Sequence, residues 1–303
     1  MEIYDYILEL EKRAKTASAA LNTASDETRR AVLLDLADRV EAASGDILAA
    51  NALDLAAAAD NGVPTPMLDR LRLTDARLSG MAEAVRALAR LDDPVGGGKT
   101  WTTPAGIHIT ERRVPLGVVA MIFEARPNVT LDAAALCIRS GNAAVLRGGK
   151  EAVESSRAVC RVVGDALEAH DLPRDGVCLV ERTERAGAEA LMTIRGYVDV
   201  LIPRGGKGLI KACVENATVP CIETGTGICH IYIDKSADIE KALKIVNNAK
   251  TSRPSVCNAA EVCLVHKDIA ETFLPRLAEI FKDRVEIRGD EAVCKIINAV
   301  PAA

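Results

Sequence analysis

Aromatic residues are scarce in this sequence, making up only 3% of its 303 residues. Because hydrophobic residues still reach 49%, the core must consist of Ala, Val, Leu and Ile, which favours helices packed on a sheet over an aromatic-rich β-sandwich. A large positive charge is also lacking, since the net charge is −5, and this argues against nucleic acid as a partner.

The sequence has no uncharged apolar run long enough to span a membrane, and charged residues interrupt its opening MEIYDYILELEKRAK, which argues against a signal peptide. Nine cysteines are scattered at irregular spacing with no CxxC pair. Apart from the neighbours Cys229 and His230, no histidine stands near a cysteine at zinc-ligand spacing, so we expect no metal site. Together these features indicate a reduced, soluble, cytoplasmic protein.

The first hundred residues have apolar residues at helical spacing and predict a helical region. Ser25 with Thr28 predicts a helix start, and Asn61-Gly62 before Pro64 predicts a stop.

From residue 114 onward, short apolar runs alternate with amphipathic stretches, which predicts βαβ units and a parallel α/β sheet. The predicted strands are 114–123, 143–147, 177–181, 198–203, 219–223, 229–234, 261–266 and 285–288. Helices are predicted over 128–140, 150–169, 237–251 and 268–282. The glycine-rich segment ETGTGIC suggests a boundary between a domain at 1–225 and a domain at 226–303.

Cys257 lies in the irregular segment KTSRPSVCNAA, between a predicted helix and a predicted strand. Lys250 and Arg253 are close to it in sequence, and neighbouring cations favour the reactive thiolate. The alternative is a small buried hydrophobe, which is how we interpret the other cysteines, since they fall on predicted helices and strands.

Asn128 follows a buried strand and Pro127, at the start of a predicted helix where backbone N–H groups point outward. Its amide could act as an oxyanion donor if a nucleophile approaches this helix. An ordinary N-cap is the alternative, and local sequence alone favours it.

Two strands lead through glycines and cations into helices, which is typical of turns that hold phosphate. The first turn runs from Arg147 through Gly148 and Gly149 to Lys150, and the second contains RGGKG at 204–208. Neither matches the GxGxxG or P-loop pattern, and ordinary turns are the alternative. A cation at such a strand end favours a 2′-phosphate over a free ribose, so the sequence favours NADPH.

Three long strings of the sequence resemble the gamma-glutamyl phosphate reductases of the aldehyde dehydrogenase superfamily. They are VPLGVVAMIFEARPNVTLDAAALCIRSGNAAVLRGGKEA, DVLIPRGGKGLIKACVENATVPCIETGTGICHIYID and NAKTSRPSVCNAAEVCLVH. The resemblance implies an aldehyde dehydrogenase-like α/β fold. Residues 1–225 would form N-terminal helices and a Rossmann-type cofactor domain, and residues 226–303 an α/β catalytic domain.

The resemblance implies NADPH-dependent reduction of L-glutamyl 5-phosphate to L-glutamate 5-semialdehyde, with release of phosphate, in proline biosynthesis. Cys257 matches the nucleophile that forms a thioester, and Asn128 matches the oxyanion asparagine. Arg126 and Arg253 are weaker candidates for binding the substrate, with structural ion pairs as the alternative. We expect NADPH or NADP to be bound by Arg147, Gly148, Gly149, Lys150, Arg204, Gly205, Gly206 and Glu223.

The role of Glu223 stays open, because it matches the position of a base in hydrolytic relatives, and a solvated turn acid is the alternative. The chain ends at Ala303, earlier than family members do, which puts activity and a homo-oligomer in doubt. The alternatives are a truncated, non-catalytic fragment, a related cysteine-dependent aldehyde dehydrogenase, and a cysteine hydrolase that would need a histidine paired with Cys257.

Overall fold

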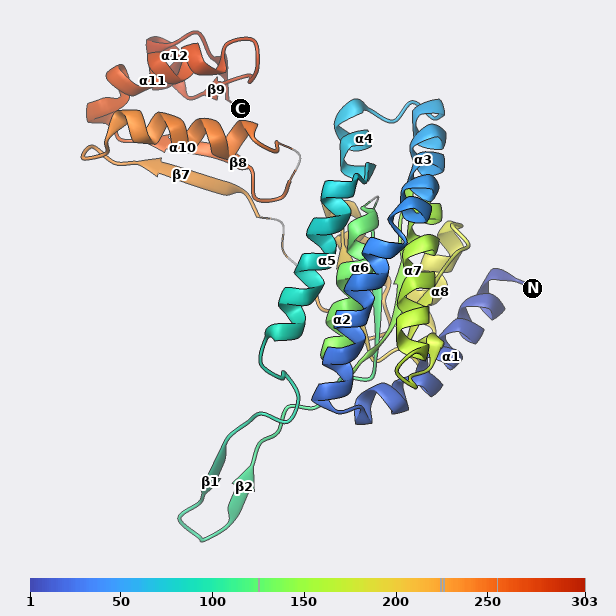
Figure 1. Cartoon of the computed structure of the whole chain (residues 1–303). Coiled ribbons are helices and arrows are strands. Elements are labelled where there is room, and N and C mark those ends of the chain that lie inside the picture. The colour runs from blue at the N-terminus through green and yellow to red at the C-terminus, as the bar shows by residue number, and fades with distance from the viewer. Residues whose placement is uncertain (125, 224, 226, 255, 303) are drawn as a thin grey trace. The chain divides into compact units, whose positions relative to one another are not determined.

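A computed structural model describes residues 1–124, 126–223, 225, 227–254 and 256–302. The chain divides into two compact units, Met1–Thr224 and Gly225–Ala303, which Figure 1 shows and which are described separately. The division falls beside the boundary that the glycine-rich segment suggests, while the functions expected of the two parts stay predictions.

The first unit opens with helices, as the apolar spacing predicts. They are α1 (Ile3–Thr23), α2 (Asp26–Ala42), α3 (Ser44–Asp60), α4 (Thr65–Leu71) and α5 (Asp75–Arg90). Ser25 caps α2, because its side chain accepts a hydrogen bond from the backbone N–H of Thr28. The chain then turns at Gly62, which has a φ of +70°, and Pro64 precedes α4.

A β-hairpin that the sequence did not predict follows the helices. Strand β1 (Thr100–Thr102) pairs antiparallel with β2 (His108–Thr110), and the two strands project away from the helices of the unit in Figure 1. All six strand residues are exposed. Gly106 takes a φ of +80° in the connecting loop, a conformation that suits glycine.

The centre of the first unit is a four-stranded parallel sheet, which confirms the predicted βαβ organisation. Its strands are β3 (Val118–Phe123), β4 (Ala143–Arg147), β5 (Val177–Leu179) and β6 (Val200–Arg204), in the order β5-β4-β3-β6. The connecting helices are α6 (Pro127–Arg139), α7 (Val153–Glu168), α8 (Arg185–Thr193) and α9 (Lys207–Asn216).

The sheet is covered by helices that belong to the same buried aliphatic core. α6 and α7 pack side by side and contact α2, whereas α1 packs against α8 and β4. Since parallel strands share one direction, the turns after β3, β4 and β6 all lie at the carboxyl edge of the sheet.

The strand expected at 114–123 begins only at Val118, and three further predicted elements differ in the structure. The strand expected at 219–223 is wrong, because only Cys221 forms an isolated bridge, to Leu201 of β6. The helix expected from Lys150 begins as a 3-10 turn at Lys150–Ala152, and α7 starts at Val153. The strand expected at 285–288 is the two-residue β9 (Arg288–Gly289).

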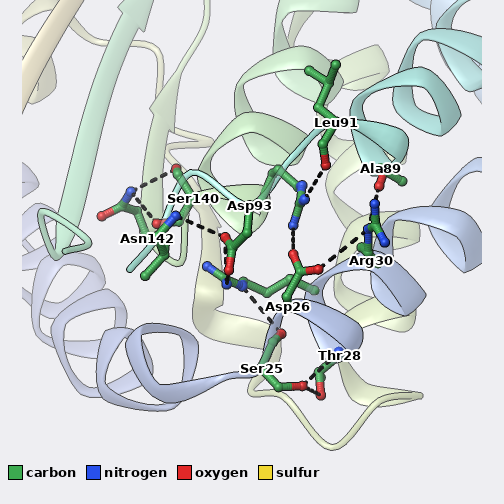
Figure 2. A network of polar contacts seen from close by, with 12 residues as sticks. Ser25, Asp26, Thr28, Arg30, Ala89, Leu91, Asp93, Ser140 and Asn142 are labelled. Atoms are coloured by element: carbon green, nitrogen blue, oxygen red, sulfur yellow. Dashed lines mark hydrogen bonds and ion pairs between the residues drawn. The ribbon is translucent and has the colours of Figure 1, made fainter. Parts of the chain in front are cut away.

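A polar network joins three helices of the first unit (Figure 2). Arg139, buried at the end of α6, is paired with Asp26 of α2 and donates to the carbonyl of Leu91 after α5 at 2.6 Å. Arg29 of α2 donates to both carboxylate oxygens of Asp93, at 2.9 and 3.0 Å. The network thus gives carboxylate partners to two arginines that the fold removes from water, although the Nε of Arg139 has no partner among the described residues.

The second unit contains a shorter version of the same alternation. Its elements are β7 (Cys229–Ile233), α10 (Ile239–Thr251), β8 (Ala260–Val265), α11 (Lys267–Phe281), β9, α12 (Glu291–Ile296) and β10 (Val300–Pro301). β7 and β8 are parallel, and β9 pairs parallel with β10. Phe273 and Phe281 lie in its own small apolar core. In the described parts of both units, every helix is too short or too polar to cross a bilayer.

Candidate functional site: two glycine turns, a pocket and an exposed cysteine

The turn after β4 carries the first group of predicted cofactor residues. Arg147 ends the strand half-buried, and its guanidinium donates to the backbone oxygen of Thr183 at 3.1 Å. Burial lowers the pKa of Arg147, and its Nε is buried with no partner in the described part of the chain. Gly148 packs tightly, since a Cβ there would lie 3.1 Å from the ring of Phe123. Lys150 is exposed on the 3-10 turn.

The turn after β6 is occupied by a carboxylate from the same protein. Glu124, directly after β3, accepts a hydrogen bond from the backbone N–H of Gly206 at 2.8 Å. A Cβ on Gly205 would lie 2.8 Å from the carboxyl carbon of Glu124, so a glycine at this position is explained by packing. A phosphate at this turn would have to displace Glu124 from Gly206, while Arg204 stands exposed beside it.

A pocket of about 560 Å³ lies beside these turns, within the first unit. Its wall is formed by Arg147 together with residues of α8 and α9: Arg185, Ala188, Glu189, Met192, Thr193, Gly208, Leu209, Ala212 and Asn216. The size and the mixture of apolar and charged walls suit an adenosine-sized ligand. Among the four residues predicted at the first turn, Arg147 contributes to this wall.

Asn128 lies in the first turn of α6, but it is not the N-cap, because Arg126 holds that position. The alternative of an ordinary N-cap for Asn128 is therefore wrong. Its side-chain N–H donates to a carboxylate oxygen of Asp132 at 3.1 Å. Burial raises the pKa of Asp132, and this hydrogen bond acts in the opposite direction. The amide of Asn128 is thus held in a fixed direction by a neighbour one turn along the helix.

Cys257 lies in the second unit, in the segment between α10 and β8. All nine cysteines are in the described part of the chain, and Cys257 is the exposed one. Burial raises the pKa of Cys137, Cys160 and Cys178 to about 12, which keeps them as unreactive thiols.

The surroundings of Cys257 are polar. Cys229 Sγ lies 3.7 Å from the backbone oxygen of Cys257. Arg253 is exposed in the same segment, while Lys250 is paired with Glu261 at 3.2 Å. The positive charge of Lys250 is therefore partly offset by this carboxylate.

The histidines near Cys257 in sequence are engaged locally. His230 Nδ1 lies 2.7 Å from the backbone oxygen of Ile228, and His266 caps α11 by accepting from Asp268 N–H at 3.2 Å. These contacts disfavour a cysteine hydrolase, which would pair a histidine with the cysteine. Glu223 is exposed after the Cys221 bridge. Within the described residues, no group of three or more metal-binding side chains comes together.

The structure gathers the cofactor candidates of the first unit at one sheet edge, along with Arg126 and Asn128. It places Cys257 and Arg253 in the second unit. The meeting of Asn128 with Cys257 across the two units stays a prediction.

Comparison with known proteins settles the family. The aldehyde dehydrogenase family matches residues 7–292 of the chain. Over its whole length the chain is 47% identical to the gamma-glutamyl phosphate reductase of Petrotoga mobilis, of which it covers 73%. The chain belongs to the gamma-glutamyl phosphate reductases within the aldehyde dehydrogenase family. The resemblance found in the sequence is therefore confirmed, and with it an oxidoreductase family.

A solved structure of the family agrees with this assignment. The crystal structure of gamma-glutamyl phosphate reductase from Thermotoga maritima matches with a TM-score of 0.88 at 39% identity, covering 98% of this chain and 72% of that one. An engineered glycolyl-CoA reductase with bound NADP+ matches with a TM-score of 0.69 at 18% identity, covering 94% of this chain and 60% of that one. The second match shows the fold alone, which is aldehyde dehydrogenase-like as expected.

Three polar residues of this sheet edge were missed in the sequence: Glu124, Asp132 and Arg185. Asp132 had a usable signal, since it stands four residues after Asn128 on the same helix. Glu124 directly follows a strand that was predicted correctly, which is where site residues concentrate. Arg185 had no signal, because its place in the wall depends on how α8 packs against α9.

Proposed function

We propose that the chain catalyses the NADPH-dependent reduction of L-glutamyl 5-phosphate to L-glutamate 5-semialdehyde and phosphate, a step of proline biosynthesis. The observation that carries this proposal is the exposure of Cys257 in a chain that is 47% identical over its length to a gamma-glutamyl phosphate reductase. Its nine free cysteines suit a reducing compartment such as the cytoplasm.

In the proposed mechanism, the Cys257 thiolate attacks the acyl carbon of the substrate. The C–O bond to phosphate breaks, phosphate leaves with the electron pair, and a thioester forms on Cys257. When bound, the nicotinamide cofactor supplies the hydride for reduction. The hemithioacetal on Cys257 then collapses, which releases the semialdehyde and returns the thiolate.

Attack on the acyl carbon and reduction of the thioester each give a tetrahedral species on Cys257. Both species carry an oxyanion that needs hydrogen-bond donors. The Asn128 amide is the proposed donor from the first unit, and the backbone N–H of Cys257 is the second. Asp132 holds the Asn128 amide at 3.1 Å, so we propose that it positions this donor. One N–H of a primary amide can keep the bond to Asp132 while the other faces the oxyanion.

The residues at the carboxyl edge of the sheet fit a dinucleotide. Arg147 lines a pocket of about 560 Å³, and its buried Nε has no partner among the described residues, so this residue has unused hydrogen-bonding capacity beside the pocket. Two cations at the turn, Arg147 and Lys150, favour a 2′-phosphate, which is why we propose NADPH over NADH. Arg204, Gly205 and Gly206 would face the pyrophosphate, and Glu223 stays a candidate cofactor contact.

The reverse reaction tests the proposal on the whole chain. We expect NADP+ to be reduced by glutamate 5-semialdehyde only when phosphate is present, and NAD+ to be the poorer acceptor. Cys257→Ala should lower kcat by roughly 10³-fold or more, because the covalent route is lost. Cys263→Ala is the matched control, since Cys263 is half-buried in β8 of the same unit and should keep activity.

Each other result points to a different conclusion. Turnover without phosphate would indicate an aldehyde dehydrogenase that oxidises free aldehydes. A folded chain that binds NADP+ without turnover would indicate a non-catalytic family fragment. Full activity in Cys257→Ala would rule out the thioester mechanism.

A further inference from the structure

The pocket between α8 and α9 is lined by two charged residues, Arg185 and Glu189, that the family resemblance did not single out. Arg185 and Glu189 of α8 line it together with Arg147 of β4. Lys150, the other cation predicted to meet the cofactor ribose, is not among the described residues of this wall. The cations that a ligand in the pocket would meet are therefore the two arginines.

The two arginines differ in how much of their hydrogen-bonding capacity is in use. Arg147 is half-buried and already donates to the carbonyl of Thr183, in the loop that leads into α8. This contact fixes the guanidinium of Arg147 and connects β4 to the start of α8. Arg147 therefore supplies a positive charge at a fixed position in the pocket wall.

Arg185, the first residue of α8, has the opposite character. Its side chain is 90% exposed, and its ion-pair partner among the described residues is Glu189, with Nε 3.6 Å from the carboxylate. An exposed ion pair at this distance contributes little, because water screens it. The guanidinium of Arg185 can thus turn to a ligand at small cost and offer two parallel N–H donors to a phosphate.

We propose that Arg185 is the residue that selects a 2′-phosphorylated adenosine in this pocket, and so sets the preference for NADP over NAD. Arg147 would hold the same phosphate from the buried side. This inference rests on the proposed function, since it assigns the adenosine end of the cofactor to the α8–α9 pocket.

The charge of Glu189 allows a second, independent test of the role of Arg185. Its carboxylate lines the same pocket and pairs with Arg185, so it opposes a dianionic phosphate and competes for the guanidinium. Removing the charge of Glu189 should therefore strengthen binding of a 2′-phosphate. If the pocket instead bound a free ribose, the same change would weaken binding, because the ribose hydroxyl would lose its acceptor.

The test is calorimetric titration of the whole chain with 2′,5′-ADP and with 5′-AMP, which differ by the 2′-phosphate. We expect Arg185→Gln to weaken 2′,5′-ADP about tenfold or more and to change 5′-AMP by less than about twofold. Arg185→Lys should retain part of the preference. Glu189→Gln should tighten 2′,5′-ADP. Arg195→Gln is the matched control, because it removes an exposed positive charge just after α8, outside the pocket wall.

Three results would overturn the inference. An equal loss for both nucleotides in Arg185→Gln would make Arg185 a general phosphate or structural contact. An equally large loss of 2′,5′-ADP binding in Arg195→Gln would show that the effect comes from the overall charge of the protein. Binding of 2′,5′-ADP unchanged in Arg185→Gln but lost in Lys150→Gln would assign the selection to Lys150. In these three cases the proposed function still stands, whereas wild-type protein that binds neither nucleotide would overturn both.

Discussion

Glu11 is the residue whose charge is most strongly altered by the fold. Its side chain on α1 is fully buried, and neither carboxyl oxygen has a hydrogen-bond partner among the described residues. Burial raises its pKa from 4.5 to about 8. The folded chain therefore holds a proton that the unfolded chain releases, and the free energy of unfolding falls as the pH rises from about 4.5 through about 8.

Glu11→Gln should remove this pH dependence, since an amide does not ionise. We expect the variant to be more stable than wild type at pH 9, on the order of 3 kcal/mol, with the difference shrinking toward pH 4. Urea unfolding at several pH values measures it. Glu9→Gln is the control, because Glu9 is exposed on the same helix. Parallel pH profiles for wild type and Glu11→Gln would contradict the assignment.

At the scale of single residues, the exposure of a candidate side chain could be predicted from the sequence, whereas its contacts could not. Cys257 was separated from eight other cysteines because it alone lies in a polar, kinked segment, and its exposure agrees with that choice. The pairing of Asn128 with Asp132, and that of Glu124 with Gly206, could not be read from the sequence. Both depend on side-chain directions and on neighbouring strands that only the folded chain fixes.

At the scale of elements, the ion pair between Asp26 and Arg139 joins α2 to α6 (Figure 2). The guanidinium of Arg139 lowers the pKa of Asp26. Asp26→Asn should destabilise the protein on the order of 3 kcal/mol at pH 7, because it leaves the buried arginine without its counter-charge. Thermal or urea unfolding followed by circular dichroism measures this loss.

Asp38→Asn is the comparison for that variant. Asp38 also lies on α2 and also pairs with an arginine, Arg86, but it is 73% exposed, so its loss should cost no more than about 1 kcal/mol. Similar losses in the two variants would show that burial of Arg139 does not decide the strength of the pair. A smaller loss for Asp26→Asn at pH 3 than at pH 7 is also expected, since protonation of Asp26 weakens the pair in the wild type.

Helices and strands were predicted best where buried apolar residues form a regular pattern along the chain. β3 and β4 are buried on both faces by helices, which gives the continuous apolar runs seen in the sequence. The hairpin β1–β2 was missed because its strand residues are all exposed, so that no burial pattern marks them. The strand expected at 219–223 contains Pro220, which has no N–H for a ladder, and only one bridge forms there.

At the scale of the whole molecule, each buried core cluster draws its residues from one unit only, among the described residues. The sequence suggested a boundary beside this division because glycines interrupt the alternation of strands and helices there. The proposed meeting of Asn128 with Cys257 stays a prediction, since no local pattern in the sequence specifies how two units dock. The pocket between α8 and α9, by contrast, is formed by residues of the first unit alone.

The first unit should therefore fold and bind the adenosine end of the cofactor without the second. A chain of residues 1–224 retains the four-stranded sheet, its buried core and every residue of the pocket wall. We expect a cooperative thermal transition by circular dichroism and a Kd for 2′,5′-ADP within about threefold of that of the full chain, because independent units contribute additively. A folded fragment with a Kd weaker by about tenfold or more would mean that the second unit shapes the pocket. A fragment without a cooperative transition would mean that the first unit needs the second in order to fold. The division at residues 224 and 225 would then separate two compact units that are not independently stable.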